Sequence, residues 1–315
     1  MVSENVKQEL EELRKKYLSL SKKYSILRIA VPGLACFSIV FFIFLFINPV
    51  VCVIGTGSVF LLALIMEIAK IILKMSASAA LRRFKELYKA EFVKGVLEES
   101  LDSVEEYKGA EGLAVEELRS YRLISMLGMP YTEDYLKARY KGITFEQSNV
   151  KLVKYRNKRE ITCFSGYVLK LPSPRQVSSV RIFSKDFTIG DSGKGFQVYF
   201  GGGNAAPIGS YSPDRIETQD SEFNEKFCVW AEQKQDMYYL LEPRFIQLLK
   251  SLLCRYPSIG FHFRDNEVYV AIETPRDTFD CDMNEPVDYI MEKEMIKGDI
   301  NQIKGIIETL QLQKN

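Results

Sequence analysis

The feature that most constrains this 315-residue chain is an apolar stretch, Ile26–Leu73. Arg28 is the only charged residue in positions 26–47, and positions 50–66 carry no charge. About 20 helical residues cross a hydrocarbon core of about 30 Å, so the stretch has room for two such helices. The pair Asn48-Pro49 between them breaks helices and favours a turn. The sequence therefore predicts a two-helix transmembrane hairpin over residues 26–73.

The charges around this stretch predict its orientation. Residues 1–90 hold 13 Lys and Arg against 6 Asp and Glu, whereas residues 91–315 have a mild acidic excess. Basic flanks of this kind face the cytoplasm, so both termini are expected there, with the lipid bilayer as a partner. An acidic domain without a basic stripe lacks the phosphate-neutralising charge that nucleic-acid binding needs, so no nucleic-acid partner is expected.

The first 25 residues show a heptad of apolar positions. Its members are Val6, Leu10, Leu13, Tyr17, Leu20, Tyr24 and Leu27. Spacings of four and three place them on one stripe of an amphipathic helix. Two interpretations remain open: an amphipathic helix packed on its own chain, or a coiled coil between subunits. Residues 74–109 are expected to extend the second membrane helix.

Residues 110–315 have the pattern of a cytosolic α+β domain. Helices are expected over 113–127, from Pro243 onward and over 287–312. Alternating positions after Pro130 predict strands, with a turn at 156–159, further strands at 176–187 and 196–200, and a hairpin over 261–272. The predicted class is α+β: an N-terminal helix and a transmembrane hairpin, followed by a cytosolic antiparallel-sheet domain with helices.

The sequence offers few candidates for chemistry. The six cysteines have no CxxC spacing, so a zinc site or a disulfide framework is not expected. The glycine-rich segments 190–195 and 201–204 lack the following helix of a phosphate-binding loop and are interpreted as hairpin loops. The one histidine, His262, lies between two phenylalanines and is interpreted as a packing or surface residue rather than a catalytic base. No catalytic residue, cofactor-binding residue or metal ligand is assigned.

Two pairs of carboxylates are the remaining candidates. Glu273 with Asp277, and Asp280 with Asp282, have the residue types for cation binding or acid–base catalysis. Their spacing is equally typical of solvated surface acids, so both interpretations stay open.

One block resembles a known family. Residues 216–230, followed by Tyr239-Leu240-Leu241-Glu242-Pro243, resemble a bacterial family of unknown function, sometimes labelled galanin-like, whose members have two membrane helices and a cytosolic α+β domain. Tyr238 and Glu242 depart from the Arg and Thr that are usual there. The resemblance implies an inner-membrane location and gives no activity. Its signature positions here are Phe223, Asn224, Phe227, Val229, Tyr239, Leu240, Leu241 and Pro243. The spacings of Phe223, Phe227 and Val229 suit burial, and Tyr239, Leu240 and Leu241 are apolar enough to enter a core.

Two functions follow as hypotheses. The first is a membrane-anchored interaction or scaffold module, with a protein partner or self-association through the helical segments. The alternative is a membrane-attached, carboxylate- or metal-dependent hydrolase or a nucleotide-responsive sensor. The sequence decides neither the ligand nor the oligomeric state, nor whether the strands form one sheet or two.

Overall fold

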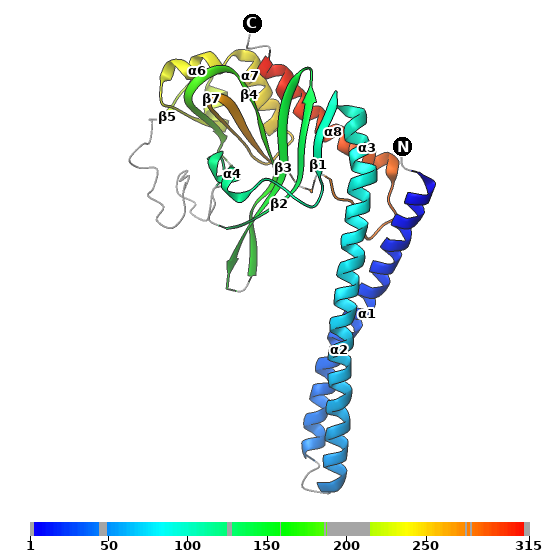
Figure 1. The fold of residues 1–315 in the computed structure, drawn as a ribbon. Coiled ribbons are helices and arrows are strands. Elements are labelled where there is room, and N and C mark those ends of the chain that lie inside the picture. The colour runs from blue at the N-terminus through cyan, green and yellow to red at the C-terminus, as the bar shows by residue number, and fades with distance from the viewer. Residues whose placement is uncertain are drawn as a thin grey trace. The chain divides into compact units, whose positions relative to one another are not determined.

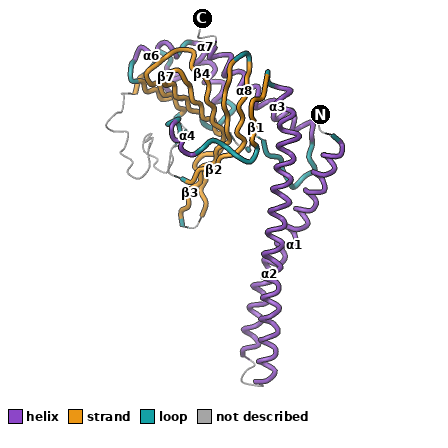
Figure 2. The backbone as a smooth tube through the Cα atoms, viewed as in Figure 1, coloured by secondary structure: helices purple, strands orange, loops and turns teal. Residues whose placement is uncertain are grey.

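Figure 1 shows the fold in a computed structural model, and Figure 2 shows its helices and strands. The structure describes residues 3–43, 49–124, 128–157, 159–185, 187, 215–274, 276–277 and 279–311; at 34–43, 49–54 and 56 it describes the backbone alone. The chain divides into two compact units. The first is Met1–Phe92 with Cys281–Tyr289, and the second is Val93–Asp280 with Ile290–Asn315.

The first unit consists mainly of two long helices that lie side by side, α1 (Glu4–Ile43) and α2 (Pro49–Leu87). A π-helical turn, Tyr88–Val93, continues α2. The predicted amphipathic helix over residues 1–25 is the first part of α1, and all seven of its heptad residues are at least partly buried. Because this burial arises within one chain, it favours packing on the chain's own second helix over a coiled coil between subunits.

The predicted transmembrane hairpin needs correction. Among the described residues, no helix has the length and apolar character needed to cross a membrane. The apolar stretch does not form two separate short spans. It is part of helices of 40 and 39 residues, whose described side chains include Arg28 and the ion pair of Glu67 with Lys70. This finding contradicts the predicted inner-membrane location with cytoplasmic termini. The predicted turn at Asn48 lies outside the described residues.

The segment 281–289 belongs to the first unit through contacts with both helices. The Arg14 guanidinium donates to the backbone oxygen of Asn284 (3.4 Å) and pairs with Glu11 (2.7 Å). The Tyr289 ring meets the edge of Phe92 at 5.3 Å. Arg14 is thereby almost fully buried with its charge compensated, as a buried guanidinium requires.

The described residues of the second unit form one antiparallel sheet of seven strands. Its strands are β1 (Ser103–Lys108), β2 (Met129–Tyr140), β3 (Ile143–Arg156), β4 (Arg159–Ser184), β5 (Arg215–Ile216), β6 (Phe227–Ala231) and β7 (Ile259–Glu273). Their order is β1-β2-β3-β4-β6-β5, and β7 pairs with β4. The structure therefore answers the question of one sheet or two, and it confirms the α+β class with an antiparallel sheet.

The 26-residue strand β4 organises this sheet. Its first half pairs with β3 and its second half with β6, while β7 pairs with both halves. The register of its pairing with β7 shifts between Pro172 and Val177. The predicted hairpin over 261–272 is wrong, because Asp265 (φ 57°) is an irregularity inside the continuous strand β7.

Helices cover both faces of the sheet. On one face, the segment 113–124, which contains α4 (Val115–Ser120), packs on a cluster that includes Val150, Phe164 and Ala271. On the other face, Phe245 of α7 (Pro243–Leu253) meets the rings of Phe261 and Phe263 at 5.5 and 5.7 Å. The remaining helices of this unit are α3 (Lys94–Ser100), α5 (Ser221–Lys226), α6 (Lys234–Leu240) and α8 (Tyr289–Gln311).

Several predicted boundaries change. The helix expected over 113–127 shortens to α4, which ends near Arg122 (φ 51°), and residues 125–127 lie outside the described part. The helical extension expected over 74–109 ends at Ser100, and β1 follows it. The helix at Pro243 and the turn at 156–159 are found where they were expected. The glycine-rich segments and the strand 196–200 lie outside the described residues.

Candidate cation-binding site

The candidate site begins at a bulge in β2. Glu133 pairs with Asn149 and Leu136 pairs with Gln147, so two residues of β2 face one residue of β3. Asp134 has a φ of 56°, a left-handed conformation that Asp tolerates better than most residues. A bulge re-aims side chains that would otherwise alternate across the sheet. The adjacent acids Glu133 and Asp134 are thereby both brought into contact with residues of the site described below.

The loop before α4 holds this bulge in place. Tyr135 N donates to the backbone oxygen of Glu111 (2.9 Å), and Leu113 N donates to Ser148 Oγ (3.1 Å). Gly112 lies directly on the strand, since a Cβ at that position would stand 2.5 Å from Glu133 N. Only glycine permits this approach, so the position of Glu133 depends on a glycine at residue 112.

The other side of the site comes from the loop after β7. Thr274 N donates to the backbone oxygen of Ser165 (2.9 Å), which continues the pairing with β4. The Arg276 guanidinium pairs with Asp299 of α8 at 2.7 Å, and burial raises the pKa of Asp299 to about 6. Phe279 is buried and meets the edge of the Tyr107 ring at 6.2 Å. These anchors fix Asp277 and Asp280.

The two sides meet at an acidic cluster, which we define as Glu133, Asp277 and Asp280. One carboxylate oxygen from each lies within 4.8 Å of the others. Like charges at this distance repel each other, and a bound cation relieves the repulsion. Of the two pairs considered from sequence, one member of each is therefore brought here. Glu273 instead accepts a hydrogen bond from Ser258 Oγ (2.6 Å), and Asp282 accepts one from Asn284 N (2.8 Å).

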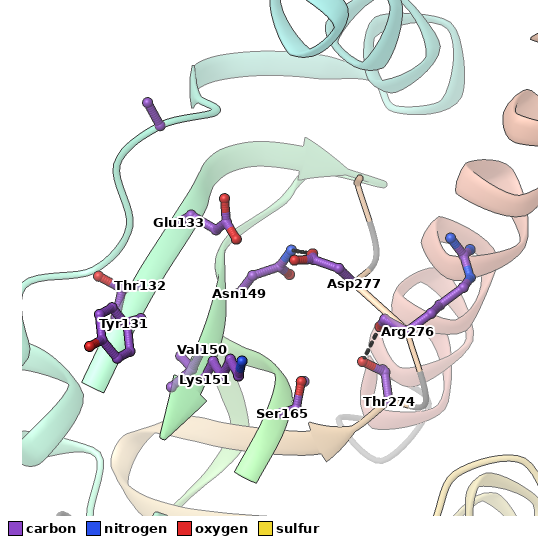
Figure 3. Close-up of a pocket in the computed structure, with 12 residues that line it drawn as sticks. Tyr131, Thr132, Glu133, Asn149, Val150, Lys151, Ser165, Thr274, Arg276 and Asp277 are labelled. Atoms are coloured by element: carbon purple, nitrogen blue, oxygen red, sulfur yellow. Dashed lines mark hydrogen bonds between the residues drawn. The ribbon is translucent and has the colours of Figure 1, made fainter. Parts of the chain in front are cut away.

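Asn149 of β3 adds a neutral oxygen beside the acidic cluster. Its side-chain nitrogen donates to Asp277 Oδ1 (2.9 Å) and to Asp134 Oδ2 (3.1 Å). Its Oδ1 is buried and has no hydrogen-bond partner, and the residue is only 6% exposed. Figure 3 shows this side chain extending between Glu133 and Asp277. Buried amide oxygens normally accept a hydrogen bond. An unpaired amide oxygen beside three carboxylates therefore indicates a site for a cation, which would accept electron pairs from all four groups.

Asp134 and Tyr107 hold the Asn149 side chain in position through hydrogen bonds. Asp134 is fully buried, and the Tyr107 hydroxyl donates to its Oδ1 at 2.7 Å. Burial, with the Asp134 charge as a further cause, raises the pKa of Tyr107 well above its usual range. The phenol therefore stays protonated and keeps donating. Asp134 in turn accepts a hydrogen bond from the Asn149 amide, so Asp134 and Asp277 together orient this side chain.

The site opens into a pocket of about 300 Å³. Figure 3 shows Glu133, Asn149 and Asp277 along one side of it. Twelve residues line this acidic pocket: Ala110, Tyr131, Thr132, Glu133, Asn149, Val150, Lys151, Ser165, Gly166, Thr274, Arg276 and Asp277. The donors beside it are all oxygens, which is the ligand set that Ca²⁺, Mg²⁺ and Mn²⁺ prefer.

His262 has the partners of a catalytic histidine without the access. Its Nε2 lies 3.2 Å from Ser179 Oγ, and its Nδ1 lies 2.9 Å from the backbone oxygen of Tyr121. His262 is fully buried, and burial together with the nearby Arg181 charge lowers its pKa to about 3. A substrate has no path to this pair, so His262 is a packing residue on the face opposite Phe261 and Phe263.

The signature positions of the resemblance lie mainly in the core. The Phe223 and Phe227 rings stack at 4.7 Å, and Val229 and Leu240 are also buried. The Asn224 side-chain oxygen accepts hydrogen bonds from Thr218 N and Oγ1, and its nitrogen donates to the Thr218 backbone oxygen. Tyr239, expected inside, is 55% exposed, Leu241 is partly buried, and Pro243 opens α7. None of the eight lines the acidic pocket. They are structural residues of the second unit.

Sequence reasoning missed Glu133 and Asn149, the two site residues supplied by the sheet. Both stand in strands whose alternation gives no sign of a binding role, and they are far from Asp277 in the chain. The only local signal is the Glu133-Asp134 pair in the middle of an otherwise half-apolar strand.

Comparisons with known proteins found one family model that matches part of the chain. Residues 162–312 match the model of a protein family of unknown function, DUF3137. The match does not extend to the galanin-like label or to membrane character. A search of the curated proteins found no match. Among solved structures, the mycobacterial trehalose monomycolate transport factor A, TtfA, is similar over 67% of this chain and 93% of its own, with 8% identity and a TM-score of 0.34. The family of unknown function is thus matched over the second half of the chain, from early in β4 to the end of α8.

Proposed function

We propose that the second unit binds a divalent cation through Glu133, Asp277, Asp280 and Asn149 Oδ1. The observation that carries the proposal is the buried, unpaired Asn149 oxygen next to three carboxylate oxygens within 4.8 Å of one another. Four oxygen donors with no cysteine or histidine among them favour a hard cation such as Ca²⁺, Mg²⁺ or Mn²⁺ over Zn²⁺.

The test is cation-dependent stabilisation of the full chain. A ligand that binds only the native state raises the free energy of unfolding by about 2.7 kcal/mol at 100 times its dissociation constant. We expect the wild type to gain stability with Ca²⁺ or Mn²⁺, and Asp277→Asn to lose most of this gain. The variant keeps an oxygen that accepts from Asn149. Without cation it should be more stable than the wild type by about 1 kcal/mol, since one repelling charge is gone.

Asp265→Asn is the matched control. It makes the same change at an exposed aspartate of β7, whose φ of 57° an asparagine adopts equally well. Its response to cation should equal that of the wild type. Equal responses from Asp277→Asn and Asp265→Asn, or no response from the wild type, would refute the proposed site.

A second candidate function is self-association through the long helices, and a row of exposed apolar side chains favours it. These residues are Ile26, Ile29, Phe60, Leu61, Leu62, Leu64, Ile65, Ile68, Ile71, Ile72 and Met75, each 47–77% exposed. A patch of this size on a helical pair is typical of an interface, and here the proposed occupant is a second copy of the chain. This retains an interaction module as a candidate.

Sedimentation of the full chain tests the second candidate. We expect a dimer or larger oligomer, shifted toward monomer by the double change Phe60→Gln and Ile71→Gln, because both side chains are more than half exposed. Ile290→Gln changes an 80% exposed apolar residue of α8 and should leave the oligomer intact. A monomeric wild type would rule the candidate out.

A further inference from the structure

The proposed cation would have an incomplete coordination sphere. Mg²⁺ takes six oxygen ligands and Ca²⁺ takes six to eight. With one oxygen from each, the four residues named above supply four ligands. Because Glu133, Asn149 and Asp277 all line the acidic pocket, the open coordination positions face that pocket. A ligand in the pocket is therefore placed to bind the cation directly.

A second row of side chains stands next to the cation ligands on the same face of the sheet. Tyr131 of β2 pairs with Lys151 of β3, and Lys151 pairs with Ser165 of β4. Lys151 lies two residues beyond Asn149, so the two side chains point to the same face with their Cα atoms about 6.6 Å apart. A group of four or five atoms is long enough to contact a cation at Asn149 and an ammonium group at Lys151 together.

Lys151 and Ser165 both have bonding capacity for a ligand. The Lys151 ammonium pairs with Glu160 at 3.3 Å, but both side chains are about half exposed, and such pairs contribute less than about 1 kcal/mol. Among the described residues, nothing accepts or donates a hydrogen bond at the Ser165 hydroxyl, although this residue is only partly exposed. Arg276, in contrast, is already paired with Asp299. Lys151 is therefore the positively charged side chain of the pocket that is best placed to pair with a bound ligand.

The charge of the pocket makes anion binding depend on the metal. The acidic cluster repels an anion when it holds no cation, and a divalent cation reverses this field. Lys151 on the same wall then adds a second positive group. A ligand with several negatively charged oxygens fits both groups, whereas a neutral ligand makes no use of Lys151. The pocket's volume of about 300 Å³ is that of a site for a small molecule.

We propose that the acidic pocket binds a phosphoryl group of a small phosphate compound. One phosphate oxygen coordinates the cation held by the acidic cluster and Asn149, and the others accept hydrogen bonds from the Lys151 ammonium and the Ser165 hydroxyl. Tyr131, which is half exposed at the pocket, packs against the organic part of the ligand. This inference rests on the proposed cation site, because the cation is the ligand of one phosphate oxygen.

The experiment uses the full chain, Mn²⁺ and phenyl phosphate. Bound Mn²⁺ is counted from the loss of the free-ion electron paramagnetic signal, and phosphate binding from the broadening of the ³¹P resonance. We expect the wild type to broaden this resonance more than Asp277→Asn does at equal free Mn²⁺. By calorimetry, phenyl phosphate should bind at least tenfold more tightly with Mn²⁺ than without it. Phenyl sulfate, which has one negative charge fewer, should bind more weakly.

Lys151→Gln separates the two proposals. It should weaken phenyl phosphate binding at least tenfold while Mn²⁺ binding stays within twofold of the wild type. Lys154→Gln, on the same strand but outside the pocket, should change neither. If Mn²⁺ binds and Lys151→Gln leaves phosphate binding intact, or if the ³¹P resonance is not broadened beyond the Asp277→Asn level, the phosphate inference fails and the cation site stands. If Mn²⁺ does not bind, both fail.

Discussion

Gly166→Ala should lower the free energy of unfolding of the second unit by about 3 kcal/mol or more, which is the range of severe overpacking. Gly166 lies where β4 passes β7. A Cβ at this position would overlap the backbone oxygen of Ile272 and stand 2.9 Å from the Cα of Glu273. Both obstacles are backbone, so no side chain can move aside, and the two strands must separate or shift their register.

Urea unfolding followed by the fluorescence of Trp230 measures this effect. Trp230 is the only tryptophan in the chain and lies in β6 of the same unit. Gly298→Ala is the control, because nothing lies within 4 Å of a Cβ at that position in α8. It should keep or slightly raise stability, since alanine favours helices. A Gly166→Ala variant within about 0.5 kcal/mol of the wild type would show that the close approach of β4 and β7 is not a constraint.

The second large effect is a loss of stability in acid caused by His262. Its pKa is about 3 in the folded chain, against about 6.5 when unfolded, because burial and the Arg181 charge disfavour the imidazolium ion. Between these two values the unfolded state binds more protons. Stability is therefore retained above pH 6.5 and falls as the pH drops toward 3, by an upper limit of about 5 kcal/mol.

Other charges around His262 must be considered in the same pH range. Arg264 and Arg122 also disfavour its protonation, and Ser179 and the Tyr121 carbonyl are neutral. Asp299 acts in the opposite direction, since its folded pKa of about 6 exceeds the unfolded value of 3.8 and its protonation adds stability below pH 6. The wild-type curve alone therefore underestimates the contribution of His262.

His262→Gln isolates this contribution. The glutamine keeps polar atoms for Ser179 and Tyr121 but does not titrate. The variant should be less stable than the wild type at pH 7.5, and the gap should shrink or reverse by pH 4.5 in urea titrations. Asp299→Asn should show the opposite trend, with its advantage over the wild type largest at neutral pH. A constant gap between His262→Gln and the wild type across this range would mean that His262 does not titrate as described.

Local chemistry explains what the sequence predicted correctly. Pro243 opens α7 because proline suits the first turn of a helix, and Asn157, with a φ of 51°, lies in a turn directly after β3, within the expected range. The same turn chemistry led to the wrong prediction of a hairpin turn at Arg264-Asp265-Asn266. A polar triplet with an aspartate at positive φ is typical of a hairpin turn, yet it is also suited to an irregularity in a long strand that pairs with both halves of β4.

The site was only half predictable, because its residues come together through tertiary pairing. Asp277 and Asp280 were considered as acids of a cation site, but their sequence neighbours Glu273 and Asp282 turned out to bond elsewhere. Glu133 and Asn149 are brought to them by the β2–β3 register and the bulge at Asp134, neither of which leaves a periodic signal. The integral-membrane prediction rested on the apolar stretch, its basic flanks and the family resemblance, and it was overturned because no described helix has the length and apolar character to cross a membrane.

The hydrogen bonds of Asn149 connect parts of the chain that meet at different times during folding. Its contact to Asp134 spans 15 residues within the β2–β3 hairpin, whereas its contact to Asp277 spans 128. Loop closure disfavours the longer contact, so it forms late. The three carboxylates therefore approach one another only after the sheet has assembled, and the chain reaches its transition state without opposing their repulsion. We therefore expect a cation at the proposed site to lengthen the lifetime of the folded state rather than to accelerate its formation.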